Sequence, residues 1–142
     1  MTDLHALRRH LHRYPERSGD ENETAAHIAA ILERTAPTAL HTGIAGHGIV
    51  AVYGGAGSPA ILLRADLDAL PILERSTMQH ASSREGTAHL CGHDGHMSIL
   101  VGAAERIARR QTDLAAPVAV LFQPAEETGQ GAAAMLEDAP DY

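Results

Sequence analysis

Two apolar runs of strand length, separated by a segment with helical spacing, restrict the fold more than any other feature of this chain. Residues 60–65 and 117–122 are almost entirely apolar, which is typical of strands buried on both faces. Between them, residues 97–109 place apolar side chains at helical intervals. Residues 48–54 are rich in β-branched side chains and predict another strand, and a glycine-rich turn is expected at 55–59. Strands separated by helices predict an α/β fold with a mixed or mostly parallel sheet flanked by helices.

Two helices are expected ahead of these strands. Apolar side chains recur at helical spacing over residues 4–11, and Pro15 stops that pattern. Asp20 stands where an N-cap would open a second helix, with Glu23 as its capping-box partner, and Pro37 ends that helix. No repeat or linker interrupts the order, so the 142 residues are expected to form a single domain.

The charge balance excludes two classes of partner. Eighteen acidic residues against eleven basic ones give a formal net charge of -7, which opposes binding to nucleic acid and to anionic membranes. No segment reaches the roughly 18 apolar residues of a spanning helix, and the first residues carry charges where a leader would be apolar. Cys91 is the single cysteine, so no disulfide can form within the chain. We expect a cytoplasmic protein.

The hexapeptide 91–96 brings a thiol, two imidazoles and a carboxylate close together in the sequence. Cys91 and His93 can reach one metal ion if the backbone is looped, which the neighbouring glycines permit. The alternative is a structural cysteine with two solvated histidines beside a helix N-terminus. Most other histidines stand in polar or helical surroundings and are expected at the surface: His5, His10, His12, His27, His41 and His47.

Pairs of carboxylates follow two of the predicted strands. Asp66 and Asp68 come after the first apolar run, and Glu126 and Glu127 come after the second. Ligands of α/β sheets gather beyond the carboxyl ends of strands, so both pairs and the segment 91–96 are expected to converge on one edge. Neighbouring glutamates on extended backbone point to opposite sides, so that one can bind a metal while the other handles a proton. The alternative for the two glutamates is a solvated loop.

Several motifs resemble those of one enzyme family. They are LHRYPE at 11–16, LRADLDALP at 63–71, HLCGHDGH at 89–96, FQPAEE at 122–127, and Gly129 with Gly131. In this order they are similar to the motifs of the metal-dependent amidohydrolases, which include N-acyl-amino-acid amidohydrolases, hippurate hydrolase and the indole-acetyl-amino-acid hydrolases. Aminoacylase and the dinuclear zinc carboxypeptidases are relatives of this family. The resemblance spans nearly the whole chain and implies the catalytic domain of a dinuclear metallohydrolase.

The resemblance implies a role for each matching residue. Cys91, His93 and Glu127 would be metal ligands, and Glu126 would be the general base for a metal-activated water. Asp68 matches an acidic residue that orients a ligand in related enzymes. The complete site would hold two divalent ions, and zinc, manganese, cobalt or nickel suits this ligand set. The implied reaction is hydrolysis of the amide bond in N-acyl amino acids, short peptides or similar small amides.

Three further residues lie in the matching motifs without a direct match to a ligand or base. Asp66 stands where related enzymes place a metal-binding histidine. Asp94 and His96 match the motif, and orientation of the ligands is the role expected for them.

Family members run to roughly two to three domain lengths. Residues 1–142 would therefore be the amino-terminal part of the catalytic domain, without the inserted dimerisation domain and the carboxy-terminal part. Such a chain is expected to be inactive alone, whereas the full-length relatives are expected to be homo-oligomers. One alternative is a metal-binding or partner-binding fragment that completes its sheet with a companion chain. A third reading is an enzyme with Cys91 as nucleophile.

Overall fold

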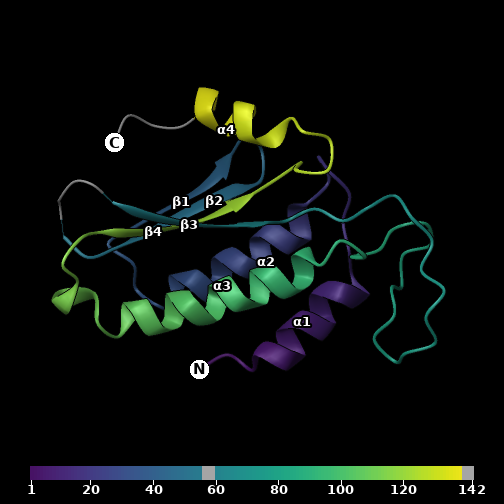
Figure 1. The fold of residues 1–142 in the computed structure, drawn as a ribbon, viewed down its shortest axis with the longest axis horizontal. Helices are drawn as coiled ribbons and strands as arrows, with labels where there is room; N and C mark the ends of the chain where they lie inside the picture. Colours follow the sequence, from purple (N-terminus) through teal and green to yellow (C-terminus); the bar gives the residue numbers. More distant parts are fainter. Residues whose placement is uncertain (56–59, 139–142) are drawn as a thin grey trace.

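The computed structural model describes residues 1–55 and 60–138, and it places one four-stranded sheet between two helical layers (Figure 1). The helices are α1 (Leu4–Arg13), α2 (Asn22–Glu33), α3 (His93–Ala108) and α4 (Gly131–Asp138), with a short 3-10 turn, η1 (Gln111–Asp113), after α3. The strands are β1 (Ala39–Ile44), β2 (Gly48–Tyr53), β3 (Ile61–Asp66) and β4 (Val118–Gln123). Helices α2 and α3 cover one face of the sheet, α1 packs against α3, and α4 lies on the opposite face.

The sheet is mixed, with strand order β1-β2-β4-β3. β2 pairs antiparallel with both β1 and β4, whereas β3 and β4 are parallel. Parallel neighbours end at the same edge of a sheet, so the segments that follow β3 and β4 leave the sheet side by side. The predicted α/β class, with a mixed sheet flanked by helices, is confirmed.

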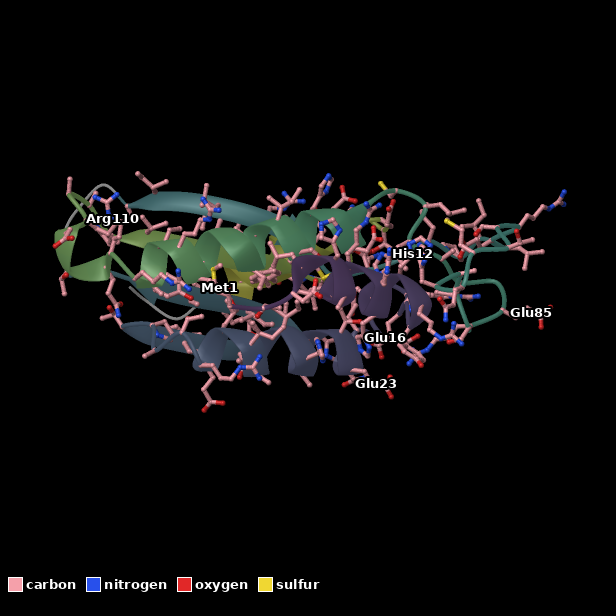
Figure 2. All side chains as sticks on the ribbon, turned by 90° about the horizontal axis from the view of Figure 1, so that it is seen from below. Met1, His12, Glu16, Glu23, Glu85 and Arg110 are labelled. Atoms are coloured by element: carbon pink, nitrogen blue, oxygen red, sulfur yellow. The ribbon has the colours of Figure 1, made fainter. Side chains whose placement is uncertain are left out.

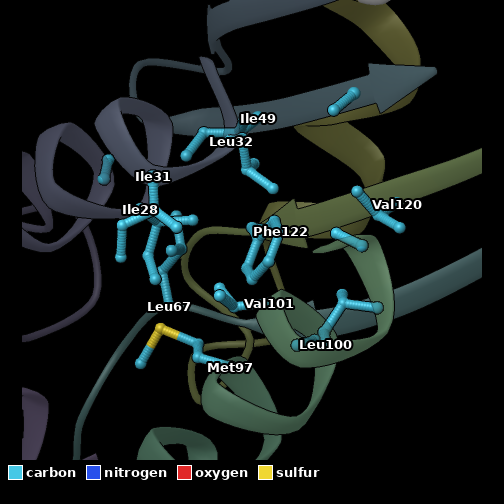
Figure 3. Packing of buried hydrophobic residues seen from close by; sticks show 14 of the residues in the cluster. Ile28, Ile31, Leu32, Ile49, Leu67, Met97, Leu100, Val101, Val120 and Phe122 are labelled. Atoms are coloured by element: carbon cyan, nitrogen blue, oxygen red, sulfur yellow. The ribbon is translucent and has the colours of Figure 1, made fainter. Parts of the chain in front are cut away.

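The main core lies between the sheet and the pair α2 and α3 (Figure 3). Phe122 of β4 sits at its centre, close to Leu32 from α2 and Val101 from α3, and all three side chains are fully buried. Burying an apolar side chain of this size contributes roughly 1.5–3 kcal/mol. A smaller cluster on the other face, built on Ile44, Val50 and Met135, attaches α4 to the sheet. These contacts fix the sheet edge from which the functional side chains project.

β3 is less buried than its sequence predicts. The prediction of burial on both faces is wrong for this strand, since Ile61 is 54% and Leu62 is 59% exposed. Within residues 1–55 and 60–138, β3 pairs only with β4 and forms one edge of the sheet. Ile61 and Leu62 are adjacent and lie on opposite faces, so both faces are exposed at the start of β3, and the small cluster around Met135 includes no β3 side chain. An apolar sequence therefore lies on an open edge.

The start of α2 also differs from the prediction. Asp20 is not its N-cap, because the helix begins after Glu21, which makes no capping bond with its side chain. The carboxylate of Glu16 instead accepts hydrogen bonds from the main-chain amides of Glu23 and Thr24 at 3.2 and 2.7 Å. A cap supplied by a residue upstream of the helix satisfies the same unpaired amides that an N-cap would.

One strand, β1, and the start of one helix, α3, were not expected from the sequence. β1 shows no regular alternation of buried and exposed side chains, which is why its sequence gives no strand signal. α3 begins at His93 rather than at 97, so the metal-type motif runs into its first turn. The predicted turn at 55–59 lies, apart from Gly55, outside the described residues. Across the described ranges, no helix has the length and apolar character needed to cross a membrane.

We expect Gly131→Ala to destabilise the chain by about 1–3 kcal/mol, as overpacking does. A Cβ at this position would lie 1.7 Å from the main-chain oxygen of Pro124, which cannot move aside as a flexible side chain can. Urea denaturation followed by circular dichroism measures the change. Gly95→Ala is the matched control, because its Cβ would meet Arg8 at 3.6 Å and alanine is favoured over glycine in a helix. Equal stability of Gly131→Ala and the parent would contradict the close approach.

Candidate metal centre

The three predicted clusters lie together at one edge of the sheet. Asp66, at the end of β3, is in register with Gln123, at the end of β4, so the carboxylates after both strands are neighbours. His93 opens α3 beside them. Gly92 precedes it with φ of 108°, a left-handed conformation that favours glycine and that turns the chain into the helix. The convergence expected from the sequence is observed.

Cys91, His93 and Glu127 each aim one donor atom at a common point. The cysteine sulfur, a ring nitrogen and a carboxylate oxygen all lie within 4.8 Å of one another. One oxygen of Glu127, Oε1, is buried without a hydrogen-bond partner in the described structure, although a buried polar atom normally has one. Thiolate, imidazole and carboxylate together form a donor set typical of zinc and similar ions. The residues present therefore fit a divalent metal ion.

His93 is oriented by the chain segment after β3. Its Nδ1 donates to the main-chain carbonyl of Asp68 at 2.9 Å, and a carbonyl oxygen can only accept, so the other ring nitrogen is left for a ligand. That atom, Nε2, lies 3.7 Å from Glu126 Oε2 and 3.9 Å from Glu127 Oε1. The side chain of Asp68, 3.5 Å from Nδ1, raises the pKa of His93 to about 9, and the charge of Asp66 adds to this effect. Burial alone would lower this pKa.

Asp68 joins three segments of the site. Its carboxylate is fully buried, and Oδ2 accepts from the Ser18 hydroxyl at 2.7 Å and from the Glu127 amide at 2.9 Å. Burial disfavours its charge, but hydrogen bonds from His93, Ser18 and main-chain amides hold its pKa at about 2. Asp68 is therefore an ionised group occupied with orienting its neighbours. Ser18 has no motif signal of its own and is missed by sequence reasoning.

Glu126 and Glu127 lie on a turn and not on extended backbone. The expectation that they point to opposite sides of a strand is wrong, because Ala125 adopts φ of 50° and a Gly129 amide bonds back to the Glu126 carbonyl. The turn directs both carboxylates toward His93. Glu126 is the more exposed of the two, with 38% of its side chain accessible against 18% for Glu127. This difference suits a proton carrier in Glu126 and a ligand in Glu127.

Cys91 is exposed and is surrounded by acid groups. Its hydrogen bond to Glu127, burial, and the charges of Glu127, Glu126 and Asp66 raise the pKa of the thiol. A nucleophilic cysteine needs the opposite shift, so these surroundings count against Cys91 as nucleophile. A bound cation would instead favour the thiolate.

Asp66 and His96 border the site. Asp66 Oδ2 lies 3.9 Å from His93 Nε2, while its other oxygen is 2.8 Å from the guanidinium Nε of Arg64. The ring centre of His96 is 6.1 Å from that of His93, and its side chain is exposed. Neither belongs to the group of three converging donors in the described part of the chain.

Asp94 faces away from the donors and toward α1. Its Oδ2 is 2.9 Å from His12 Nδ1 and 3.3 Å from Arg8 Nε, and His12 Nε2 also contacts Glu74 at 3.2 Å. The surface position predicted for His12 is wrong, since this residue is buried and contacts the carboxylates of Asp94 and Glu74. Figure 2 shows the place of His12 on α1. Nothing in the helical spacing of α1 distinguishes His12 from exposed residues, but it does fall within the LHRYPE motif.

His89 is a second buried histidine near the site that sequence reasoning did not single out. Its side chain is buried, and neither ring nitrogen has a hydrogen-bond partner in the described structure. Burial, reinforced by His93 and His12 and opposed by Asp94, lowers the pKa of His89 to about 4. The residue is therefore neutral, and its place in the 89–96 motif was the only available signal.

Comparison with known proteins agrees with this geometry. Residues 62–142 match the sequence profile of peptidase family M20/M25/M40. The chain is similar to an N-acetyl-L-cysteine deacetylase of Bacillus subtilis, at 45% identity over 95% of this chain and 32% of that protein. It is also similar to an N-acyl-L-amino acid amidohydrolase of Geobacillus stearothermophilus, at 37% identity over 93% of this chain and 36% of that protein.

A solved structure shows the same arrangement of elements. A Bacillus subtilis protein, described as a dinuclear metal-binding peptidase of the M20 family, superposes with a TM-score of 0.88 at 40% identity. The superposition covers 95% of this chain and 38% of that protein. The chain thus spans about a third of the length of the curated relatives it matches. By its motifs, its fold and the match over 62–142, the chain belongs to peptidase family M20/M25/M40.

Proposed function

We propose that this chain is the amino-terminal part of the catalytic domain of a metal-dependent amidohydrolase. The substrate class is N-acyl amino acids, short peptides or similar small amides. The observation that carries the proposal is the approach of Cys91, His93 and Glu127 to one point, with Glu126 beside them. Two relatives, a deacetylase of N-acetyl-L-cysteine and an amidohydrolase of N-acyl amino acids, support this substrate class by their names.

The same proposal assigns the metal content and the missing parts. The complete site would hold two divalent ions, zinc, manganese, cobalt or nickel, for which Cys91, His93 and Glu127 supply part of the ligands. Further ligands and the inserted dimerisation domain would come from outside residues 1–142. The dinuclear description of the solved M20 relative supports two ions. We also propose that the complete protein is a homo-oligomer, as the family resemblance implies.

The residues of the chain divide the chemistry. Cys91, His93 and Glu127 would hold a divalent ion, which would supply Lewis-acid chemistry: polarisation of the substrate carbonyl and a lower pKa for water. Glu126 would take a proton as the water oxygen bonds to the carbonyl carbon, and it would deliver that proton to the amine nitrogen as the carbon–nitrogen bond breaks. The products are a carboxylic acid and a free amino acid. Asp68, through its bonds to Glu127 and His93, keeps the ligands in place.

We expect the complete protein to lack nucleic-acid and membrane partners and to be cytoplasmic. A net charge of -7 supports the absence of nucleic-acid and membrane partners. A cytoplasmic location is supported by the single cysteine, Cys91, which is free and which a reducing compartment would keep available as a ligand.

We expect Glu126→Gln to lower kcat by about 10²- to 10⁴-fold, because glutamine cannot accept the proton. The assay uses a chimera in which residues 1–142 replace the matched segment of the Bacillus subtilis deacetylase, with N-acetyl-L-cysteine as substrate. Glu33→Gln, an exposed residue at the end of α2, makes the same chemical change away from the site and should leave kcat unchanged. Normal turnover by the Glu126→Gln chimera would refute the assigned base.

The chain alone should bind Co²⁺ and show the absorption band of a cobalt thiolate. Cys91→Ser should abolish that band. His93→Gln or Glu127→Gln should weaken Co²⁺ binding by at least roughly 100-fold, which is the upper end of the loss caused by substituting a residue that only orients ligands. Because the pKa of His93 is about 9 and a metal needs the neutral ring, the affinity should rise with pH up to that value. His5→Gln, on the exposed side of α1, is the control. An undiminished band in Cys91→Ser would show that the ligand assignment is wrong.

The partner-binding alternative has one observation of its own, the exposed edge strand β3. Its apolar side chains and unpaired backbone edge suit the addition of a strand from another polypeptide segment. If this reading holds, size-exclusion chromatography with light scattering should give a species larger than 15.0 kDa. Substituting Ile61 and Leu62 by lysine should then restore a monomer. A monomer of the parent chain that binds no hydrophobic dye would count against this alternative.

A further inference from the structure

Glu21 is a fully buried carboxylate outside every motif discussed above. It lies at the start of α2, and its side chain is 0% exposed. Burying a carboxylate is costly unless hydrogen bonds compensate it, so such a group needs a structural or functional reason. Its contacts lead across the sequence to the turn that carries Glu126.

Both carboxylate oxygens of Glu21 accept main-chain hydrogen bonds. Oε2 accepts from the Gly19 amide at 2.9 Å, and Oε1 accepts from the Ala125 amide at 2.8 Å. His47 Nε2 lies 4.0 Å from Oε2 and also contacts the Gly19 carbonyl at 3.2 Å. The bond to the Ala125 amide joins residues 104 positions apart and links the start of α2 to the turn that carries Glu126 and Glu127.

Ala125 requires such support. Its φ of 50° is in the left-handed region, which residues with a Cβ rarely adopt. The Ala125 carbonyl accepts from the Gly131 amide, and two positions further along the Glu127 amide donates to Asp68. The turn is thus held by two buried carboxylates, Glu21 at its start and Asp68 at its third residue. Glu126, which lies between these two anchors, has its direction fixed by them.

We propose that Glu21 is a positioning residue for the Glu126–Glu127 pair. It holds the Ala125 amide and so keeps the turn in the conformation that directs both carboxylates toward His93. This inference rests on the proposed function only in taking Glu127 as a metal ligand and Glu126 as the base. In the described structure the Glu21 side chain contacts Gly19, Ala125 and His47 and not the three donor atoms.

Two amide donors require two acceptor oxygens, which gives the proposal a specific test. Glutamine has nearly the same shape as glutamate but one acceptor, and its NH₂ group would face a main-chain N–H. In the 142-residue chain, Glu21→Gln should weaken Co²⁺ binding by roughly 10- to 100-fold, as loss of a ligand-orienting residue does. The cobalt thiolate band from Cys91 should persist at saturation. Glu33→Gln, on the same helix, is the matched control.

A double-mutant cycle separates positioning from general destabilisation. If Glu21 acts through Glu127, then Glu21→Gln should cause no further loss of Co²⁺ affinity in a Glu127→Gln background. Equal losses in both backgrounds, or an unchanged affinity in the single variant, would overturn the proposal. Absence of Co²⁺ binding by the parent chain would overturn it as well.

A measurement without substitution covers the case in which Glu21→Gln fails to fold. In the parent chain the Ala125 amide should be protected from hydrogen exchange, although it lies in a surface turn. Exchange at the rate of an unstructured peptide would contradict the bond to Glu21. The two proposals fail separately. A chimera without hydrolytic activity would refute the proposed function, but the losses of Co²⁺ affinity could still be non-additive. An active chimera together with additive losses of Co²⁺ affinity would refute only the role of Glu21.

Discussion

The site depends on the hydrogen bonds and the ion pair made by the buried carboxylate of Asp68. It accepts hydrogen bonds from Ser18 and from the Glu127 amide, and it lies beside His93. The segment before α2, the first residue of α3 and the turn after β4 therefore meet at one group. A charge buried this completely needs compensation, which comes from the hydrogen bonds to Oδ2 and from the nearby His93 ring, and the same contacts orient the ligands.

Burial and charge together explain the electrostatics of the site. The low pKa of Asp68 and the high pKa of His93 are two aspects of one pair, in which each charge favours the other. In the metal-free chain the positive His93 faces Glu126 and Glu127 and partly balances them. A divalent ion would supply positive charge at the same place. That positive charge offsets the repulsion between the neighbouring carboxylates.

Much of the fold was accessible from the sequence because apolar periodicity reports directly on burial. It predicted β2, β3, β4 and the body of α3 correctly. The burial expected for β3 on both faces was wrong, because a sequence pattern shows which residues are apolar but not what covers them. The pattern also failed for the cap of α2, since Glu16 reaches those amides from outside the helix. His12 was misplaced because its partners, Asp94 and Glu74, are distant in sequence.

Residue types and their order already point to the chemistry: a thiol, an imidazole and paired carboxylates, placed after strands or before a helix, indicate a hydrolytic metal centre. How these groups are held is visible only in the folded chain. The parallel pairing of β3 with β4 brings the carboxylates together, and the left-handed Ala125 turns Glu126 and Glu127 toward His93. Glu21 and Asp68 support that turn through main-chain amides. Residue types are local information, whereas hydrogen bonds between residues 50 and 104 positions apart exist only once the core has folded.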